Sequence, residues 1–187
     1  MVVHDSRRNL ESITIRRAKP EDAPSLIEFV SELYDEPDVY IPYTSQEAVP
    51  SLEAQQREIN CHSRDNCLYL VAQTTAIPAQ IIAELICTGN KYQAIKHVTY
   101  LAMNVHRNWR DQGVGSALLT EAIEWAKWTN IISRIELEVY ARNSAAVHLY
   151  KKFGFHTEGC KQNAVCQRGE YYDMLVMSLL LERQKAT

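Results

Sequence analysis

Residues 105–117 of the 187-residue chain read VHRNWRDQGVGSA and connect an expected strand to an expected long helix. A helix N-terminus presents unpaired backbone N–H groups and the positive end of the helix dipole. Gly113 and Gly115 remove the side chains that would keep an anion away from these groups. The stretch therefore predicts a phosphate-binding loop that is built from backbone alone.

The spacing of the two glycines excludes two common nucleotide-binding motifs. A dinucleotide-binding loop needs a third glycine where this chain has Leu118. A Walker loop needs a Gly-Lys-Ser/Thr run, which is absent. A Gly-x-Gly pair alone is also compatible with close packing of a helix start against a strand, so the choice depends on the rest of the chain.

The patterns around this loop predict an α/β fold. Residues 113–128 carry a broad apolar stripe typical of an amphipathic helix, and residues 134–140 alternate with the period of a half-buried strand. Asn143 can cap a short helix that ends near Gly154. Further strands are expected over residues 13–18, 67–72, 79–86, 97–105, 155 onward and 171–181, and helices over residues 20–35 and 45–60. We expect one domain at 13–182, between tails at 1–12 and 183–187.

Length and composition, 46% hydrophobic, fit one globular domain with its own core. No run of about 18 apolar residues is present, and residues 1–12 lack the apolar segment of a signal peptide, so we expect a soluble, cytoplasmic protein without a membrane partner. The five cysteines show no Cys-x-x-Cys pair and the six histidines no His-Glu-x-x-His pair, which argues against disulfides and metal. Nucleic acid is not expected, because basic residues form no dense stripe.

The net charge of −3 is unevenly distributed. Residues 21–60 contain ten acidic residues and one basic residue, Arg57, and so carry −9, which leaves +6 for the rest of the chain. The acids are Glu21, Asp22, Glu28, Glu32, Asp35, Glu36, Asp38, Glu47, Glu53 and Glu58. Two interpretations are open: these acids form the solvated faces of two helices, or they raise the local concentration of a cationic substrate.

The loop and a second motif together resemble the GNAT superfamily of acyl-CoA N-acyltransferases. The first match is Arg110-x-x-Gly113-x-Gly115, the pattern of that family's pyrophosphate-binding loop. The second is residues 137–139 followed by residues 143–155, which read NSAAVHLYKKFGF. This second run is similar to the family's Asn-x-x-Ala-x-x-Leu-Tyr helix and its Gly-Phe exit. The resemblance covers roughly residues 13–181, although the first third matches in pattern only.

This resemblance implies a mixed, mostly antiparallel central sheet flanked by helices, in which parallel strands ending near Val105 and Val139 splay apart. It implies acetyl-CoA as co-substrate, with its pantetheine arm in the gap. The backbone of Met103, Asn104 and Val105 would bond the pantetheine amides. Cofactor contacts are further implied for Arg110, Asp111, Gln112, Gly113, Val114, Gly115, Ser116, Asn143 and Ala146, and for Tyr150, whose hydroxyl would face the sulfur.

Some of these residues have structural alternatives. Asn143 is among the best capping residues, and Tyr150 could be a packed aromatic of its helix. The side chain of Arg110 is also explained as a solvated charge that attracts phosphates in general.

The expected reaction is acetyl transfer to a primary amine by direct attack in a ternary complex. Tyr150 is the expected proton donor to the leaving thiolate. Many relatives have a glutamate in the central strands as general base, but residues 99–105 contain no acid. Glu84 is our first choice and Glu138 the other strand glutamate. A covalent route through Cys87 is less favoured, because no His/Asn partner is identifiable.

These motifs leave the acceptor open. We expect a small-molecule amine, and the acidic segment at 21–60 makes a cationic amine one candidate. The alternatives are the N-terminus or a lysine of a protein, and a non-catalytic acyl-CoA sensor, against which the presence of Tyr150 argues. Dimerisation is common in the family, so a homodimer is a further expectation.

Overall fold

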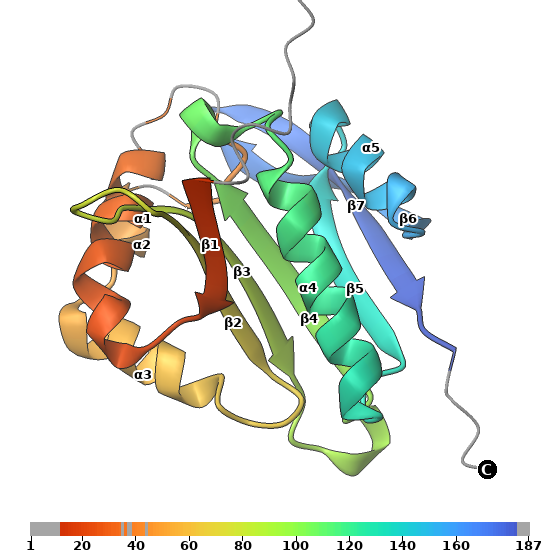
Figure 1. Cartoon of the computed structure of the whole chain (residues 1–187). Coiled ribbons are helices and arrows are strands. Elements are labelled where there is room, and N and C mark those ends of the chain that lie inside the picture. Colours follow the sequence, from red (N-terminus) through yellow and green to blue (C-terminus); the bar gives the residue numbers. More distant parts are fainter. Residues whose placement is uncertain (1–11, 35, 37–38, 44, 183–187) are drawn as a thin grey trace, which may run out of the picture.

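The computed structural model describes residues 12–34, 36, 39–43 and 45–182. Its centre is a seven-stranded sheet with the order β1-β2-β3-β4-β5-β7-β6 (Figure 1). The strands are β1 (Ile13–Arg17), β2 (Leu68–Thr74), β3 (Ile81–Gly89), β4 (Val98–Val105), β5 (Arg134–Tyr140), β6 (His156–Gln167) and β7 (Glu170–Leu180). Neighbouring strands are antiparallel except for the parallel pair β4 and β5. The predicted fold class, a mixed and mostly antiparallel sheet, is confirmed.

Five α-helices and three short 3-10 helices accompany the sheet in the described ranges. They are α1 (Ala23–Tyr34), α2 (Ser45–Ala48), α3 (Leu52–Cys61), α4 (Val114–Thr129), α5 (Ser144–Lys152), η2 (Pro20–Asp22), η3 (Gln93–Ile95) and η4 (Arg107–Trp109). Within these ranges, no helix has the length and apolarity needed to cross a membrane. Of the two expected tails, only Ser12 lies inside the described residues.

Strand β2 shows why helices cover both faces of the sheet. Successive side chains of a strand point to opposite faces. Leu68 and Leu70 pack into the larger core, which contains the apolar stripe of α4, whereas Tyr69 and Val71 pack into the smaller core with α1 and α3. Figure 1 shows α4 along the sheet and α1 and α3 near β1 and β2. The sheet therefore has α4 on one face and the α1–α3 pair on the other.

The helix expected over residues 45–60 is in fact two helices, and the single-helix prediction is wrong. Pro50 has no N–H to donate, and it disfavours helical geometry at the preceding residue. Ser51 then begins α3 as its N-cap, because its hydroxyl accepts a hydrogen bond from the Ala54 N–H at 3.2 Å. The chain between α1 and β2 is therefore divided into short elements.

A gap between β4 and β5 positions the candidate site. The two strands pair over only three registers, the last of which joins Tyr100 and Glu136. Beyond that point β4 continues to Val105, paired with β3, and β5 continues to Tyr140, paired with β7. The later part of β4 therefore has no strand partner on its β5 side. This is the splayed arrangement that the resemblance implied.

Candidate active site

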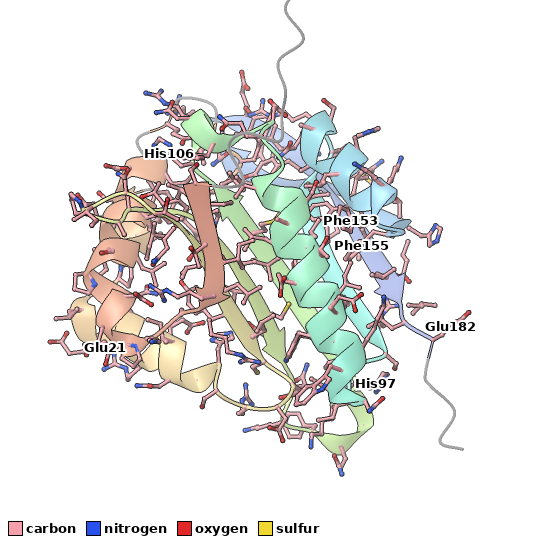
Figure 2. All side chains as sticks on the ribbon, viewed as in Figure 1. Glu21, His97, His106, Phe153, Phe155 and Glu182 are labelled. Carbon is pink, nitrogen blue, oxygen red and sulfur yellow. The ribbon has the colours of Figure 1, made fainter. Side chains whose placement is uncertain are left out.

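Strand β4 leads directly into the predicted phosphate loop. Figure 2 shows His97 and His106 at opposite ends of this strand, and from His106 the chain passes through η4 to the N-terminus of α4. Asp111 has φ 58 and Gly113 has φ 86, which are left-handed values. Turns of this kind direct successive N–H groups toward a common anion site. Because Gly113 has no side chain to cap α4, the first-turn amides of this helix stay available to a ligand.

Gly115 brings α4 into close contact with its neighbours. A Cβ atom added at Gly115 would lie 3.2 Å from Leu149 Cδ2 and 3.4 Å from Met103 Cε. Leu149 belongs to α5 and Met103 to β4, the two elements for which further cofactor contacts were implied. The two glycines therefore differ in role: Gly113 permits the turn, and Gly115 permits the packing.

The side chain of Arg110 is held by the protein. Its guanidinium forms an ion pair with Glu36, and its Nε donates to the Val105 carbonyl at 3.0 Å. Glu36, whose side chain is 4% exposed, also accepts from the Arg107 N–H at 3.0 Å. The solvated-charge interpretation of Arg110 holds only in part, because its side chain is 40% exposed but its charge is paired with Glu36. Glu36 fastens the segment that follows α1 to the loop that precedes α4.

Helix α5 places Asn143 and Tyr150 near the gap. The side-chain oxygen of Asn143 accepts from the Ala146 N–H at 3.1 Å, so its capping interpretation is confirmed. Tyr150 is 6% exposed, and its ring centroid lies 5.6 Å from that of Phe155. Burial raises the pKa of Tyr150 above its ordinary value, at which the hydroxyl is already protonated at neutral pH. The contacts of both residues with a cofactor stay predictions.

Glu84 occupies a buried polar network beside the gap. It lies on β3 opposite Asn104 of β4, and its two oxygens accept from the Asn104 side-chain amide at 2.9 Å and from the Tyr69 hydroxyl at 2.6 Å. Gln55 of α3 in turn donates to the Tyr69 hydroxyl at 3.0 Å. Burial raises the pKa of Glu84 above its ordinary value. A carboxylate of raised pKa is suited to accept a proton near neutral pH.

The expected general base need not lie on β4 itself. The acid stands on the neighbouring strand, and Asn104 connects it to the edge of the gap. Tyr69 and Gln55 were not among the predicted site residues. The available signal was the polar group of Tyr69 inside the otherwise apolar residues 68–72 of β2.

Glu138 is less suited than Glu84 to act as the general base, and Cys87 is poorly suited to act as a nucleophile. Glu138 of β5 forms an ion pair with Lys161 of β6, which holds its carboxylate, and at 27% its side chain is more exposed than that of buried Glu84. Cys87 is buried beside a second buried cysteine, Cys67, and burial raises the pKa of the Cys87 thiol, which disfavours the nucleophilic thiolate. No group of three metal-ligating side chains occurs among the residues whose structure is described.

An aromatic cluster surrounds the end of β5. The Tyr140 ring centroid lies 5.5 Å from that of Tyr40 and 6.0 Å from that of Tyr172. The guanidinium carbon of Arg142 lies 3.8 Å from the Tyr172 centroid and 5.3 Å from the Tyr40 centroid. Tyr40 belongs to the segment between α1 and α2, and Tyr172 belongs to β7. The cluster thus joins three parts of the chain at the outer end of the gap.

A polar cavity of about 440 Å³ lies on another side of the loop. Its lining includes Glu32, Glu36 and residues 106–109 but neither Glu84 nor Tyr150. The cavity therefore borders the loop and is separate from the expected reaction centre.

This geometry agrees with comparisons to known proteins. The family model for the acetyltransferase (GNAT) family matches residues 28–155. The chain belongs to this family. The L-amino acid N-acetyltransferase AaaT of Escherichia coli (strain K12) is 30% identical over 169 residues, which cover 90% of this chain and 98% of that protein.

Solved structures of GNAT proteins superpose on most of the chain. An acetyltransferase of the GNAT family from Streptococcus pneumoniae has a TM-score of 0.84 and 30% identity, and the match covers 91% of this chain and 99% of that one. A GNAT superfamily phosphinothricin acetyltransferase from Sinorhizobium meliloti, in complex with AcCoA, has a TM-score of 0.79. It is 18% identical, with 94% and 92% of the two chains covered, and shows the fold alone. The enzyme class inferred from the two motifs, an acetyltransferase, is confirmed.

Proposed function

We propose that this GNAT acetyltransferase transfers the acetyl group of acetyl-CoA to the primary amine of a small molecule. The observation that carries the proposal is the convergence of three features at the end of β4: the uncapped N-terminus of α4, the gap beyond Tyr100, and buried Glu84. The structure of the Sinorhizobium meliloti neighbour in complex with AcCoA supports acetyl-CoA as the co-substrate. The name of AaaT supports amino acids as the first acceptors to test.

The residues present fit acetyl-CoA. Backbone amides at 110–116, in the turn with positive φ at Asp111 and Gly113, would hold its pyrophosphate. The backbone of Met103, Asn104 and Val105, free of a strand on the β5 side, would bond the pantetheine amides. The side-chain amide nitrogen of Asn143 would add a contact, because the helix cap uses only its oxygen.

Acetyl-CoA supplies a thioester carbonyl that an amine can attack. Glu84 takes the proton of the attacking amine, directly or through a water, and the Tyr69 and Asn104 hydrogen bonds hold its carboxylate in place. Backbone N–H groups of β4 at the gap stabilise the negative charge that develops on the carbonyl oxygen. The Tyr150 hydroxyl, which is protonated at neutral pH like that of any tyrosine, donates to the leaving sulfur, although burial raises its pKa and so makes it a weaker acid. Because the buried Cys87 thiol resists ionisation, we propose direct attack without an acetyl-enzyme.

The acids at 21–60 favour their structural interpretation over substrate steering. Of the eight that lie in the described residues, Asp22 and Glu36 pair with Arg16 and Arg110. Glu58 and Glu32 lie within 4 Å of the imidazoles of His62 and His106, which offset their charge only when protonated. The charges of Asp22 and Glu36, which are offset by arginines within the protein, attract a soluble cation less strongly. We therefore place neutral and zwitterionic amines ahead of the cationic amine expected from the sequence. The cytoplasmic location and the homodimer stay predictions.

A panel of acceptors tests this function. Free amino acids, amino-acid amides, polyamines and a short peptide with a free N-terminus are each incubated with acetyl-CoA, and released thiol and product mass are measured. We expect acetylation of free amino acids. A preference for the peptide would favour the protein-acetyltransferase alternative. Binding of acetyl-CoA without acetylation of any amine would favour the sensor alternative.

A further inference from the structure

Arg142 is an exposed cation at the end of β5 that has no carboxylate partner among the described residues. None of the ion pairs found in residues 12–34, 36, 39–43 and 45–182 includes it. Its guanidinium instead stacks on Tyr172, with Tyr40 also within cation–π distance. The contact with the Tyr172 ring and a hydrogen bond to the Tyr172 side chain position the guanidinium, whose five N–H donors exceed what these contacts use. A pair of these donors matches the two oxygens of a carboxylate.

The position of Arg142 relates this cation to the acyl-transfer site. It stands directly before Asn143, the cap of the helix that carries Tyr150, and two residues after Tyr140. The two aromatic partners come from the segment between α1 and α2 and from β7. Arg142 therefore lies at the outer end of the gap between β4 and β5, where an acceptor would enter.

A second observation points to a polar ligand at the same place. The hydroxyl of Tyr140 is buried and has no hydrogen-bond partner among the described residues. Buried hydroxyls without a partner are rare, because losing water without a replacement bond costs free energy. Tyr140 lies in the same ring cluster as Arg142, whose charge acts on it. An anionic group bound by Arg142 would offer this hydroxyl the acceptor that the protein does not provide.

The segment that carries Tyr40 is joined by a hydrogen bond to the hairpin of β6 and β7, which carries Tyr172. The side-chain amide of Gln167, at the end of β6, donates to the Ile41 carbonyl in the segment that carries Tyr40. The Arg142 stack is therefore held from both sides. The site as a whole has an acid, Glu84, beside the gap and a cation, Arg142, at its outer end. The two charges have the signs that a zwitterion would need, with its ammonium toward Glu84 and its carboxylate toward Arg142.

Building on the proposed function, we propose that Arg142 binds the carboxylate of an amino-acid acceptor and is a specificity-determining residue of this enzyme. The enzyme then selects free amino acids over their amides and over peptide N-termini, in which an uncharged amide replaces the carboxylate. The acceptor chemistry is thus an α-amine next to a free carboxylate.

The test compares the parent with Arg142→Gln on matched acceptors. The best amino acid of the panel, its amide and its decarboxylated amine are assayed for kcat/KM at saturating acetyl-CoA. We expect the parent to prefer the amino acid over the amide by about ten- to a hundredfold, the range of a hydrogen bond to a charged group. Arg142→Gln should lose that factor for the amino acid and leave the two acceptors without a carboxylate unchanged.

Two further variants separate charge from geometry. Arg142→Lys keeps the charge without the planar fork and should recover only part of the preference. Lys127→Gln removes one positive charge from α4, where Lys127 pairs with Glu124, and should behave as the parent. Calorimetry with acetyl-CoA checks that Arg142→Gln binds the co-substrate as the parent does.

Several results would overturn the carboxylate assignment alone: equal use of amino acid and amide by the parent, an equal loss for all three acceptors in Arg142→Gln, or weakened acetyl-CoA binding in that variant. If no amine is acetylated, the proposed function fails. Calorimetric titration of the amino acid into the CoA-bound protein then still tests Arg142, because binding that survives Arg142→Gln would overturn the assignment.

Discussion

Glu84→Gln removes the expected general base with almost no change in side-chain size. In the parent, the two Glu84 oxygens accept from Tyr69 and Asn104. The glutamine keeps one acceptor, which Asn104 can use, and presents an amide to Tyr69, where one hydrogen bond is lost. We expect kcat/KM to fall by about 10²- to 10⁴-fold, the usual contribution of a general base. This corresponds to about 3–5 kcal/mol of transition-state stabilisation.

The stability of the same variant should change little at neutral pH. Loss of one hydrogen bond costs about 1 kcal/mol, and removal of a buried carboxylate offsets part of this cost. For a chain of this size, the melting temperature should then change by no more than about 4 °C. A low activity in Glu84→Gln can therefore be separated from unfolding by a melting curve with acetyl-CoA present.

The pH dependence gives a second, independent readout. Burial raises the pKa of Glu84, so the folded chain holds this proton more tightly than the unfolded chain. The resulting stabilisation is full below the unfolded pKa of about 4.3 and is lost as pH rises through the folded pKa. The free energy of unfolding of the parent, relative to that of Glu84→Gln, should therefore fall over this range. Chemical denaturation at a series of pH values measures it.

The assay is kcat/KM between about pH 5 and pH 9, with Glu138→Gln as the matched glutamate variant on the other side of the gap. The parent should lose activity on the acidic side as Glu84 becomes protonated, and Glu84→Gln should lack that limb. Full activity in Glu84→Gln, with chemistry shown to be rate-limiting, would refute the assignment. A larger loss of kcat/KM in Glu138→Gln than in Glu84→Gln would instead identify Glu138 of β5 as the general base.

Three further outcomes follow from the same geometry. Tyr150→Phe should lower turnover by about 10²- to 10⁴-fold and leave acetyl-CoA affinity unchanged in a calorimetric titration; an unchanged rate of the chemical step would leave Tyr150 a packing residue. Gly113→Val should strain the left-handed turn and weaken acetyl-CoA binding. Gly169→Val, at φ 81 in the β6–β7 turn, should cause similar strain without affecting this affinity. Equal affinities for acetyl-CoA in both variants would place the anion site elsewhere. Glu36→Ala should destabilise the chain by about 1–3 kcal/mol in urea denaturation, because it leaves both Arg110 and the Arg107 N–H without their carboxylate partner. A destabilisation no greater than that of Glu32→Ala, at an exposed position, would contradict a structural role for these Glu36 contacts.

Local signals in the sequence predicted the elements around the site closely. Helix α4 begins one residue after Gly113, and α5 begins one residue after Asn143, because a left-handed glycine and a capping side chain act on their immediate neighbours. Strand β5 has the predicted bounds, since its period of two is a property of residues 134–140 alone. Pro50 shows the limit of periodicity, because a helical pattern continued across a residue that ends the helix.

The interactions that the sequence did not reveal connect distant residues. Glu36 and Arg110 are 74 positions apart, and neither has a local pattern that marks it as paired. Glu84 was predicted as a candidate base from its strand, but its Tyr69 partner depends on the register of β2 with β3. The stack of Arg142 likewise requires two other segments to meet at the end of β5. Such contacts follow from the assembled sheet, which no single stretch of sequence specifies.

Stoichiometry in a single reaction tests the central claim most directly. The protein is mixed with acetyl-CoA, first alone and then with the best amino acid of the panel, while free thiol, N-acetyl product and intact protein mass are followed. We predict no thiol release and no acetylated protein without the amine, and one thiol per N-acetylated product with it. A protein that acquires an acetyl group before amine is added, or releases thiol without forming N-acetyl product, would contradict direct transfer between the two substrates.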